Sequence, residues 1–457
     1  MTSHTLLPRA ALVALLAALA GCASVSPERG FDDVARSTQA RTGFVPRLAH
    51  DDASRQQIAA AVGELLRQPL GADDAVRIAV LNNPRLQAAY WEVGIAQADL
   101  AQASRLPNPS FDFKRTSQGG DIGIERTFTM SLVGALTTPL KARLESKRFQ
   151  QVKLAVGAEI ERQVAGTRRA WVEAVAARQA VGYARQVDKA AEASAELSAR
   201  MAQAGNASKL DLAREQAFHA ESSAAVARAE RDAVAARERL ARQLGLPDGQ
   251  FTLPDRLPDL PATPAELTDI EQLALAQRLD VQAARQDAES TAAALGLTKT
   301  TRFINVLDLG YVRNTGSDVP MGHGYEVTLE LPLFDWGGAR VARAEAVYMQ
   351  SVNKVAEAAV NARSEAREAW QGYRSAYELA RRYRDEVIPL RKQISKEVLL
   401  RYNGMLASTF ELLADSREQA GAVNGYIQSL KDFWLAHAAL EAALGTRVTD
   451  TNKGTQQ

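Results

Sequence analysis

Apolar side chains recur along most of the chain with the three- and four-residue spacing of a helix. The clearest stripe lies in the second half of the chain, and its steps are four, four, three, four and four residues. Its members are Leu379, Tyr383, Val387, Leu390, Ile394 and Val398. Such a stripe covers one side of a helix and predicts packing of the coiled-coil type. Pro389 lies inside the stripe, and we expect it to kink the helix because proline has no amide hydrogen.

Helical spacing persists over segments of unusual length, and short breaks divide it. The breaks at 205–206 and 403–404 each contain glycine and separate two helical segments, so chain reversal there predicts two helical hairpins. The long helices are predicted at 141–204 and 340–402, the returning helices at 207–244 and 407–444, and two short helices at 74–105 and 267–300. In each half the short and returning helices together match the long helix in length, so we expect them to lie end to end against it.

Two stretches change from helical spacing to strict alternation. Residues 122–132 and 325–331 alternate apolar side chains with small or polar ones, which predicts strands with one apolar and one wet face. The predicted hairpin partners are 109–115 and 304–313, and the connecting glycine-containing turns are 119–121 and 316–318. The sequence therefore predicts a small β part made of two hairpins.

The order of these elements occurs twice. Residues 75–89 correspond to 270–284 and residues 207–212 to 407–412, so the spacing between copies drifts only from 195 to 200 residues. A repeat of this length is a duplicated module and not a solenoid, whose units are roughly 20 to 50 residues. The predicted fold class is mainly α with a small β part, internally duplicated, with long antiparallel coiled-coil hairpins and four strands.

These patterns divide the chain into six segments. The predicted division is a signal peptide at 1–21, a lipidated extended segment at 22–70, a first repeat at 71–245, a proline-rich crossover at 246–266, a second repeat at 267–445 and a tail at 446–457. We expect the crossover to connect two halves that are not independent domains, because neither half could stand alone.

The first segment has the form of a secretory signal. An apolar run at 10–20 follows Arg9 and ends in Gly21 and Cys22, with small residues at the cleavage point. The run is about half of the ~20 residues that span a bilayer, which disfavours a membrane anchor. The pattern resembles the bacterial lipobox, which implies that Cys22 carries a covalent lipid such as palmitate. The absence of Asp at Ala23 implies release to the outer membrane.

Charge and composition exclude several classes of function. Lys and Arg total 55 and Asp and Glu total 54, so the net charge is too small to favour binding of nucleic acid. The five histidines are isolated, and none lies at metal-ligand or catalytic spacing from the single cysteine. No glycine-rich phosphate loop is present. The sequence predicts neither an enzyme nor a bound cofactor or metal.

The predicted strands have the length and alternation of transmembrane strands. The alternative is a soluble sheet that covers a core. Four strands cannot close a membrane barrel, and open sheet edges are not tolerated in hydrocarbon. If these strands span a membrane, several copies of the chain must pool them. Oligomerisation follows from that constraint, although the number of copies does not.

Two motifs complete this plan. One is the segment 331–340 (LPLFDWGGAR), and the other combines 402–404 with Ser408 and 411–413. With the duplicated elements and the lipobox, they make the chain from Gly71 to Gly445 resemble the outer-membrane efflux protein family typified by TolC, of the lipoprotein type. The resemblance implies a homotrimer with a β-barrel in the outer membrane and an α-barrel across the periplasm. It also implies a passive exit duct that works with a periplasmic adaptor protein and an inner-membrane pump.

In such ducts, rings of acidic side chains restrict passage at the periplasmic end. The resemblance assigns the first gating carboxylate to Glu411, and Asp211 is its counterpart in the first half. The second carboxylate falls at or next to Ala414, with Asp415 one place on, so this chain departs from the family pattern. Like charges that converge on one axis repel one another and can bind cations. The alternative is that these are ordinary solvated helix carboxylates.

The two breaks are candidate docking tips for the adaptor. The residues concerned are Gly205, Asn206 and Ser208 in the first break and Gly404, Met405 and Ser408 in the second. Glycine permits the backbone to reverse, and small side chains allow a partner helix to approach closely. The alternative is a plain helical turn with no partner.

The chief alternative function is a periplasmic adaptor lipoprotein, which would also carry a lipobox and long hairpins. An adaptor would have one hairpin inside β-rich domains, whereas this chain has two hairpins and two strand pairs. The duplication therefore favours the duct. A third class, an enzyme or binding protein with a coiled-coil arm, lacks a recognisable site.

Overall fold

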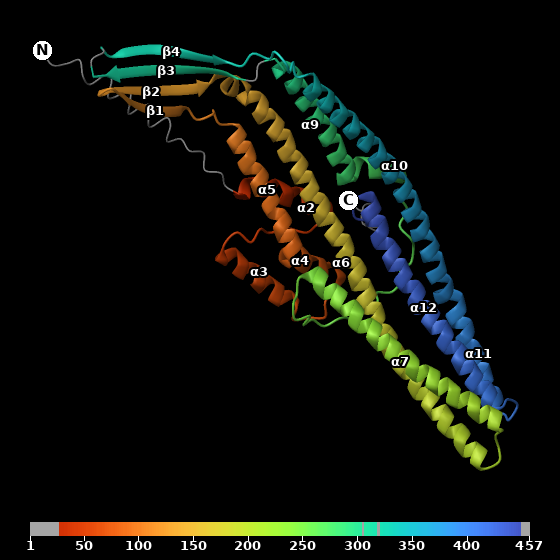
Figure 1. Cartoon of the computed structure of the whole chain (residues 1–457). Helices are drawn as coiled ribbons and strands as arrows, with labels where there is room; N and C mark the ends of the chain where they lie inside the picture. The colour runs from red at the N-terminus through yellow and green to blue at the C-terminus, as the bar shows by residue number, and fades with distance from the viewer. Residues whose placement is uncertain (1–26, 304–305, 318–319, 449–457) are drawn as a thin grey trace, which may run out of the picture.

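The computed structural model describes residues 27–303, 306–317 and 320–448. The molecule is elongated, with a small sheet at one end and the tips of two helical hairpins at the other (Figure 1). The predicted signal peptide, Cys22 and most of the predicted tail lie outside the described residues. Within them, no helix is both long enough and apolar enough to cross a membrane.

The elements follow the predicted order in both halves. The first half contains α2 (Pro27–Thr42), α3 (Asp52–Leu65), α4 (Ala72–Asn82), α5 (Pro84–Ala103), β1 (Ser110–Gln118), β2 (Asp121–Ser131), α6 (Leu132–Gln203) and α7 (Lys209–Leu244). The second half contains α8 (Ile270–Gln277), α9 (Leu279–Thr301), β3 (Leu307–Gly316), β4 (Gly322–Leu329), α10 (Gly338–Arg382), the π-helical turn η1 (Tyr383–Val387), α11 (Ile388–Asn403) and α12 (Thr409–Leu444). The predicted class, mainly α with long hairpins and a small β part, is confirmed.

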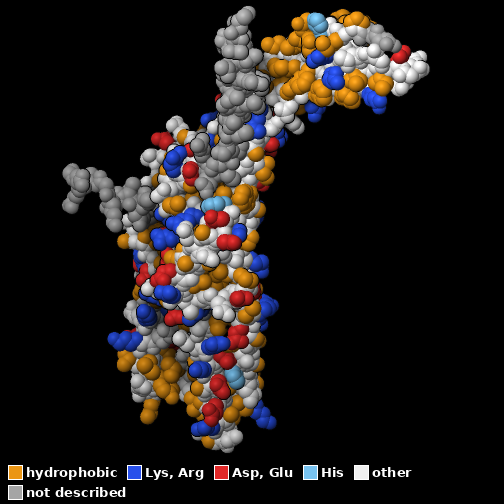
Figure 2. Space-filling view, turned by 90° about the vertical axis from the view of Figure 1, so that its left-hand side faces the viewer, with side chains coloured by type: hydrophobic (Ala, Val, Ile, Leu, Met, Phe, Trp, Pro, Cys, Tyr) orange, Lys and Arg blue, Asp and Glu red, His pale blue; other side chains and the backbone are white. Residues whose placement is uncertain are grey.

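The strands form one antiparallel sheet in the order β1-β2-β3-β4. Both predicted hairpins are present, and β2 and β3 join them across the two halves, with Phe128 opposite Tyr311. Aromatic rings pair across the strands, with centroids 5.4 Å apart for Phe111 and Phe128 and 5.9 Å apart for Tyr311 and Tyr325. Hydrophobic side chains gather on the surface at this end of the molecule (Figure 2). In the single chain β1 and β4 each leave one edge unpaired.

The first long helix begins well before the predicted residue 141. Helix α6 starts at Leu132, because the hydroxyl oxygen of Ser131 accepts a hydrogen bond from the amide of Gly134 at 3.3 Å and caps the helix. Pro139 therefore lies inside the helix. Proline removes one backbone donor there, a local cost that does not outweigh the bonds along the rest of a 72-residue helix.

Each predicted short helix is divided into two. Helices α4 and α5 are separated at Asn83, which has an extended backbone, because the residue before a proline avoids the helical region and Pro84 follows. The Asn83 side chain then caps α5 by accepting hydrogen bonds from the amides of Arg85 at 2.9 Å and Leu86 at 3.3 Å. Helices α8 and α9 are likewise separated at Arg278, which has an extended backbone, but no proline follows it and its side chain does not cap α9.

The N-terminal segment contains the helices α2 and α3, so the prediction of an extended segment at 22–70 is wrong for residues 27–42 and 52–65. Helix α2 buries Phe31 and Val34, which lie three residues apart, and helix α3 buries Ile58 and Val62, which lie four apart. Both pairs have helical spacing. Short helices of this kind are marginal in isolation and depend on tertiary packing. Helix α2 obtains that packing from α5 and α6.

The expected disturbance at Pro389 takes the form of a π-helical turn. The turn η1 immediately precedes α11, and Pro389 occupies the first turn of that helix. The backbone is helical on both sides of this junction, so the wider π-helical turn accommodates a proline that has no amide to donate. The ring of Tyr383, the first residue of η1, packs against Gly425 of α12, where a Cβ atom would lie 2.7 Å from the tyrosine oxygen.

The predicted end-to-end arrangement is present, and its first meeting point is closely packed. Helices α5 and α7 both lie along α6. Gly245 ends α7 with a φ of 70°, and a Cβ atom there would lie 2.9 Å from the carbonyl oxygen of Asn82. The Asn82 side chain donates to the carbonyls of Leu244 at 3.1 Å and Gly245 at 2.9 Å. The Asn83 side chain donates to that of Gln243 at 2.9 Å. Two adjacent asparagines thus clasp the end of α7.

The second meeting point has the same backbone arrangement, but a different side chain bonds the end of the returning helix. Helices α9 and α12 lie along α10, and Gly445 ends α12 with a φ of 67°. A Cβ atom at Gly445 would lie 3.2 Å from the Cα atom of Arg278. Here Arg41, from the N-terminal helix α2, donates to the carbonyls of Gly445 at 3.0 Å and of Gln277. Arg41 is held in place by Glu161 of α6, at 2.6 Å.

The crossover between the halves contributes to the main hydrophobic core. Its buried side chains are Phe251, Leu253, Leu257 and Leu260. Side chains of the second half also bind its backbone: Tyr377 donates to the carbonyl of Ala262 at 2.7 Å, and Trp434 donates to that of Pro258 at 3.0 Å. The same core contains Trp171 of α6. The two halves therefore share one core across the crossover.

We predict that Gly245→Ala destabilises the folded protein. A Cβ atom there meets the backbone of the α4–α5 break, and alanine is strained at this positive φ, so the expected loss is roughly 1–3 kcal/mol. The thermal midpoint of the purified protein should fall. The matched control is Gly182→Ala in α6, where a Cβ atom meets nothing within 4 Å. That substitution should leave the midpoint unchanged or raise it, because alanine is the better helix former. Equal midpoints for the two variants would contradict the close approach at Gly245.

Candidate functional site

The predicted docking tips form the end of the molecule opposite the sheet (Figure 1). At the first tip, α6 ends at Gln203, and Gly205 adopts a φ of 78°. The amide of Gly205 donates to the carbonyl of Ala202 at 3.1 Å, and the amide of Asn206 donates to that of Met201 at 2.8 Å. This pair of bonds is the Schellman motif, in which the residue in the left-handed region is usually glycine.

The second tip has the same motif but not the same residue at its turning point. The amides of Met405 and Leu406 donate to the carbonyls of Tyr402 at 3.0 Å and Arg401 at 2.8 Å. Met405 carries the positive φ of 60°, whereas Gly404 has an ordinary φ of −83°. The prediction that glycine permits the reversal is therefore wrong at this tip. Met405 occupies the position equivalent to the glycine of the first tip, and its side chain is 94% exposed.

Both returning helices begin at a serine cap. The hydroxyl oxygens of Ser208 and Ser408 accept from the amides of Asp211 and Glu411, both at 3.1 Å. Ser208 also donates to a carboxylate oxygen of Asp211 at 2.6 Å, and Arg214 lies 3.7 Å from that carboxylate. An acidic group in the first turn also interacts favourably with the helix dipole. Asp211 is thus engaged locally, whereas the Glu411 side chain is exposed.

A buried ion pair about two turns beyond the caps connects the two hairpins. Glu215 of α7 is 2% exposed and accepts from the hydroxyl of Ser194, in α6, at 2.6 Å. It is also paired with Arg417 of α12, whose guanidinium lies 4.8 Å from the centre of the Phe218 ring. The sequence analysis missed this pair. The duplication marks the acidic position, because Glu215 and Asp415 stand 200 residues apart at equivalent positions, but it gives no signal for Arg417, whose equivalent is Ala217.

Asp415 lies one turn after Glu411 on α12 but in a different environment. Its residue exposure is 8%, and within the described part of the chain its Oδ2 atom has no hydrogen-bond partner. A buried polar atom without a partner costs about 1–3 kcal/mol. Two of the three predicted gate residues, Glu411 and Asp415, thus lie on α12 and differ in burial, whereas Asp211 lies on α7.

A cavity of about 290 Å³ lies beside the Glu215–Arg417 pair, between α6, α7 and α12. Tyr183, Phe218 and Leu413 line it. Burial raises the pKa of Tyr183 above its usual value, so its hydroxyl stays protonated. The two hairpins therefore touch through the ion pair and leave space next to it. Among the described residues, no group of three or more His, Cys, Asp or Glu is placed to hold a metal ion.

Comparison with solved structures shows that this fold is shared with outer-membrane channels. The Campylobacter jejuni CmeC outer membrane channel superposes with a TM-score of 0.69 at 16% sequence identity, covering 83% of this chain and 86% of CmeC. The open state of the Neisseria gonorrhoeae MtrE outer membrane channel gives 0.68 at 18% identity, covering 84% and 91%. A membrane protein from Pseudomonas aeruginosa gives 0.69 at 20% identity, covering 82% and 93%.

Comparison of sequences gives a more limited match. The chain is 29% identical over 290 residues to Protein CyaE of Bordetella pertussis. That match covers 57% of this chain and 60% of CyaE, so the chain matches about three fifths of the relative's length. No protein-family model matches the chain.

We predict that the glycines of the two tips respond oppositely to alanine. Gly205→Ala strains the left-handed residue of the Schellman motif and should destabilise the first tip by about 1 kcal/mol. Gly404→Ala should be neutral, because its φ is ordinary and the nearest atom to a Cβ lies 3.5 Å away. Hydrogen exchange of the tip amides checks this. Protection should fall roughly fivefold at the first tip and stay unchanged at the second. An equal effect at both tips would show that the two reversals are built alike.

Proposed function

We propose that this protein is the outer-membrane exit duct of a tripartite efflux pump. It conducts substrates passively from an inner-membrane pump and a periplasmic adaptor, and it catalyses no reaction. The observation that carries the proposal is the shared fold with the CmeC and MtrE outer membrane channels over 83% and 84% of this chain. The alternative, an adaptor lipoprotein with one hairpin, fits less well because the chain has two long hairpins joined to one sheet.

The proposed assembly is a homotrimer whose strands form one barrel. The sheet of a single chain leaves an edge at β1 and another at β4. Exposed edges in a membrane require partners, and strands of neighbouring copies supply them. Large apolar side chains on the same sheet support burial in lipid or against another copy, for example Phe113, Tyr325 and Val327.

The proposed location is the outer membrane of a Gram-negative bacterium, with the helices in the periplasm. The lipobox-like sequence supports a lipid anchor on Cys22. Helix α2 begins five residues after that cysteine, and a hydrogen bond from Arg41 attaches it to the middle of the molecule. A lipid at Cys22 would thus tether the N-terminal segment to the membrane, in addition to the strands.

The proposed gate lies near the tips. The Glu215–Arg417 pair holds α12 against the first hairpin at the narrow end of the molecule. In a trimer, the carboxylates of Glu411 and Asp415 from three copies would surround one axis and attract cations. Asp211 has a smaller part in this proposal, because Ser208 and Arg214 already engage it.

We predict that Arg417→Gln increases the single-channel conductance of the protein in a planar bilayer. The substitution leaves the Glu215 carboxylate buried without its cation, which costs several kcal/mol and favours separation of the hairpins. The matched control is Arg391→Gln, because Arg391 pairs with Glu418 of the same hairpin, at 2.5 Å, and with no other carboxylate of the described residues. Conductance of the control should equal that of the unmodified protein.

The acidic residues have their own readout in the same experiment. Combined Glu411→Ala and Asp415→Ala substitutions should remove block by divalent cations. If Arg417→Gln and the double alanine variant both show the conductance and the divalent-cation block of the unmodified protein, the gate is not at this position. If the purified oligomer forms no channel at all, the duct function itself is contradicted.

The proposed adaptor-docking surface consists of the two tips, and the second tip carries the stronger signal. Met405 and Leu406 are 94% and 81% exposed. Met405 also holds a backbone conformation that costs about 1 kcal/mol for a residue other than glycine. Exposed apolar side chains on a rigid turn suit insertion between the helices of a partner hairpin.

We predict that Met405→Asp with Leu406→Asp abolishes efflux without preventing assembly. Both side chains point into solvent, and aspartate tolerates the left-handed conformation, so the fold should be retained. A deletion strain carrying this variant should lose resistance in a panel of metals and drugs, while heat-labile trimers remain in the outer-membrane fraction. Leu406→Met is the control and should retain resistance. Full resistance with both aspartates present would place docking elsewhere.

A further inference from the structure

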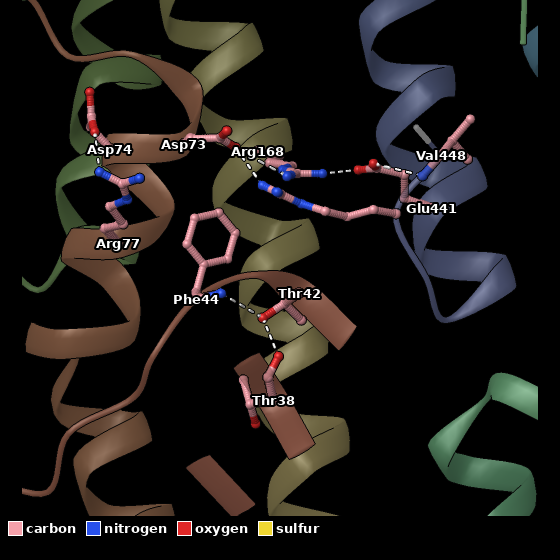
Figure 3. Close-up of polar contacts among 10 residues, drawn as sticks. Thr38, Thr42, Phe44, Asp73, Asp74, Arg77, Arg168, Glu441 and Val448 are labelled. Atoms are coloured by element: carbon pink, nitrogen blue, oxygen red, sulfur yellow. Dashed lines mark hydrogen bonds and ion pairs between the residues drawn. The ribbon is translucent and has the colours of Figure 1, made fainter. Parts of the chain in front are cut away.

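A second cavity lies in the middle of the molecule, away from the tips and the sheet. It has a volume of about 270 Å³ and lies where the end of α2, α6, the start of α9 and the end of α12 come together. Figure 3 shows part of its polar wall, with Arg168 of α6 between Asp73 and Glu441. Nothing in the proposed conduction path uses this cavity.

The wall of the cavity is rich in arginine. Its charged lining residues are Arg41, Arg162, Arg168, Arg169, Arg278 and Arg447, against Glu161, Asp280 and Glu441. Six arginines thus line the space with three carboxylates, and Asp73, Glu159 and Glu365 pair with four of these arginines from outside the lining. Arginine stays charged at all physiological pH values and offers several donors in a fixed plane, which suits carboxylate, sulfonate and phosphate groups.

Two of these arginines compete for one carboxylate oxygen. The Oδ1 atom of Asp73 lies 3.2 Å from Arg168 and 2.9 Å from Arg447. Burial, and then the neighbouring charge of Arg447, lower the pKa of Arg168 below its usual value. Arg168 is also paired with Glu441, so these two arginines share two carboxylates while their own positive charges lie close together. A bound anion would relieve the repulsion between the two guanidinium groups.

Two other arginines keep donors available. Arg162 and Arg85 both pair with the carboxylate of Glu159, and the Nε atom of Arg85 lies 2.8 Å from the Oε1 atom of that carboxylate. Arg169, two turns further along α6, is exposed and forms no ion pair within the described part of the chain. Neither residue connects α12 or α2 to α6, so both are available to a ligand without loss of an interhelical contact.

The rest of the wall is apolar and made largely of small side chains. Ala158, Ala165, Leu279 and Ala438 belong to it. Small side chains leave the space open, and their methyl groups favour contact with an apolar surface. We propose that this cavity binds an organic anion, in which an acidic group meets the arginines and a compact apolar body lies on the alanines. The site is separate from the proposed gate and docking tips.

The test measures binding of 2-naphthoate to the assembled full-length protein in lipid nanodiscs by equilibrium dialysis. Arg162→Gln with Arg169→Gln should weaken binding at least tenfold, and raised salt should weaken binding to the unmodified protein. Ala442 lines the cavity and is exposed, so Ala442→Trp should fill the space and abolish binding without disturbing the core. The control is Arg228→Gln with Arg231→Gln, two exposed positions on α7, which should bind as the unmodified protein does.

Three results would overturn the proposal. One is the lack of saturable binding to the unmodified protein, as expected if a neighbouring copy covers the cavity. Another is equal affinity for the neutral analogue 2-naphthalenemethanol, which would remove the role of the arginines. The last is unchanged affinity in both the arginine and the Ala442→Trp variants, which would place the ligand elsewhere. None of these results bears on the proposed duct, because conductance is a separate measurement.

Discussion

The architecture depends on the close end-to-end approach of two helices along a third. At Gly245 and Gly445 the end of a returning helix meets the break between two short helices, and in both places a Cβ atom would press on backbone. Only glycine combines the positive φ with this proximity. Because the two short pieces together reach as far as the long helix, the column stays several helices thick over its length. The sheet and the tips thereby lie at opposite ends of one elongated molecule (Figure 1).

Periodicity and duplication were sufficient to predict the order of elements, both strand pairs and the position of the tips. They were insufficient where tertiary contacts decide the local structure. The break at Asn83 has a local signal in Pro84, but the equivalent break at Arg278 has none and follows only from the contact with Gly445. Helix α2 is too short to be stable alone and is defined by its packing. The Glu215–Arg417 pair joins residues 202 positions apart, so no spacing along a helix indicates it.

The two halves share a backbone plan and differ in how each plan is completed. At the first meeting point, asparagines of the first half donate hydrogen bonds to the end of α7. At the second, Arg41 of the N-terminal helix donates to the end of α12. Glu215 of the first half is bound by Ser194 of the same hairpin and by Arg417 of the second half, whereas the equivalent Asp415 keeps an oxygen without a partner among the described residues. The positions equivalent to Ser194 and Arg417 in the other half are Ile394 and Ala217, which offer no hydrogen bond to a carboxylate. The two halves therefore share a backbone plan but not the side-chain contacts that complete it.

This asymmetry bears on how copies of the chain would associate. In a closed ring the helices of the first half meet those of the second half twice, once within a chain and once between neighbouring chains. Arg417 serves the contact within the chain, whereas the Oδ2 atom of Asp415 has no partner among the described residues. At the far end of the molecule β1 and β4 each leave one edge unpaired, and in the proposed homo-oligomer each edge would adjoin a strand of a different copy. A partner that bound only the sheet or only the tips would complete one of these features and leave the other. A second copy packed along the full length of the chain would complete both, which favours the proposed homo-oligomer on physical grounds independent of any resemblance.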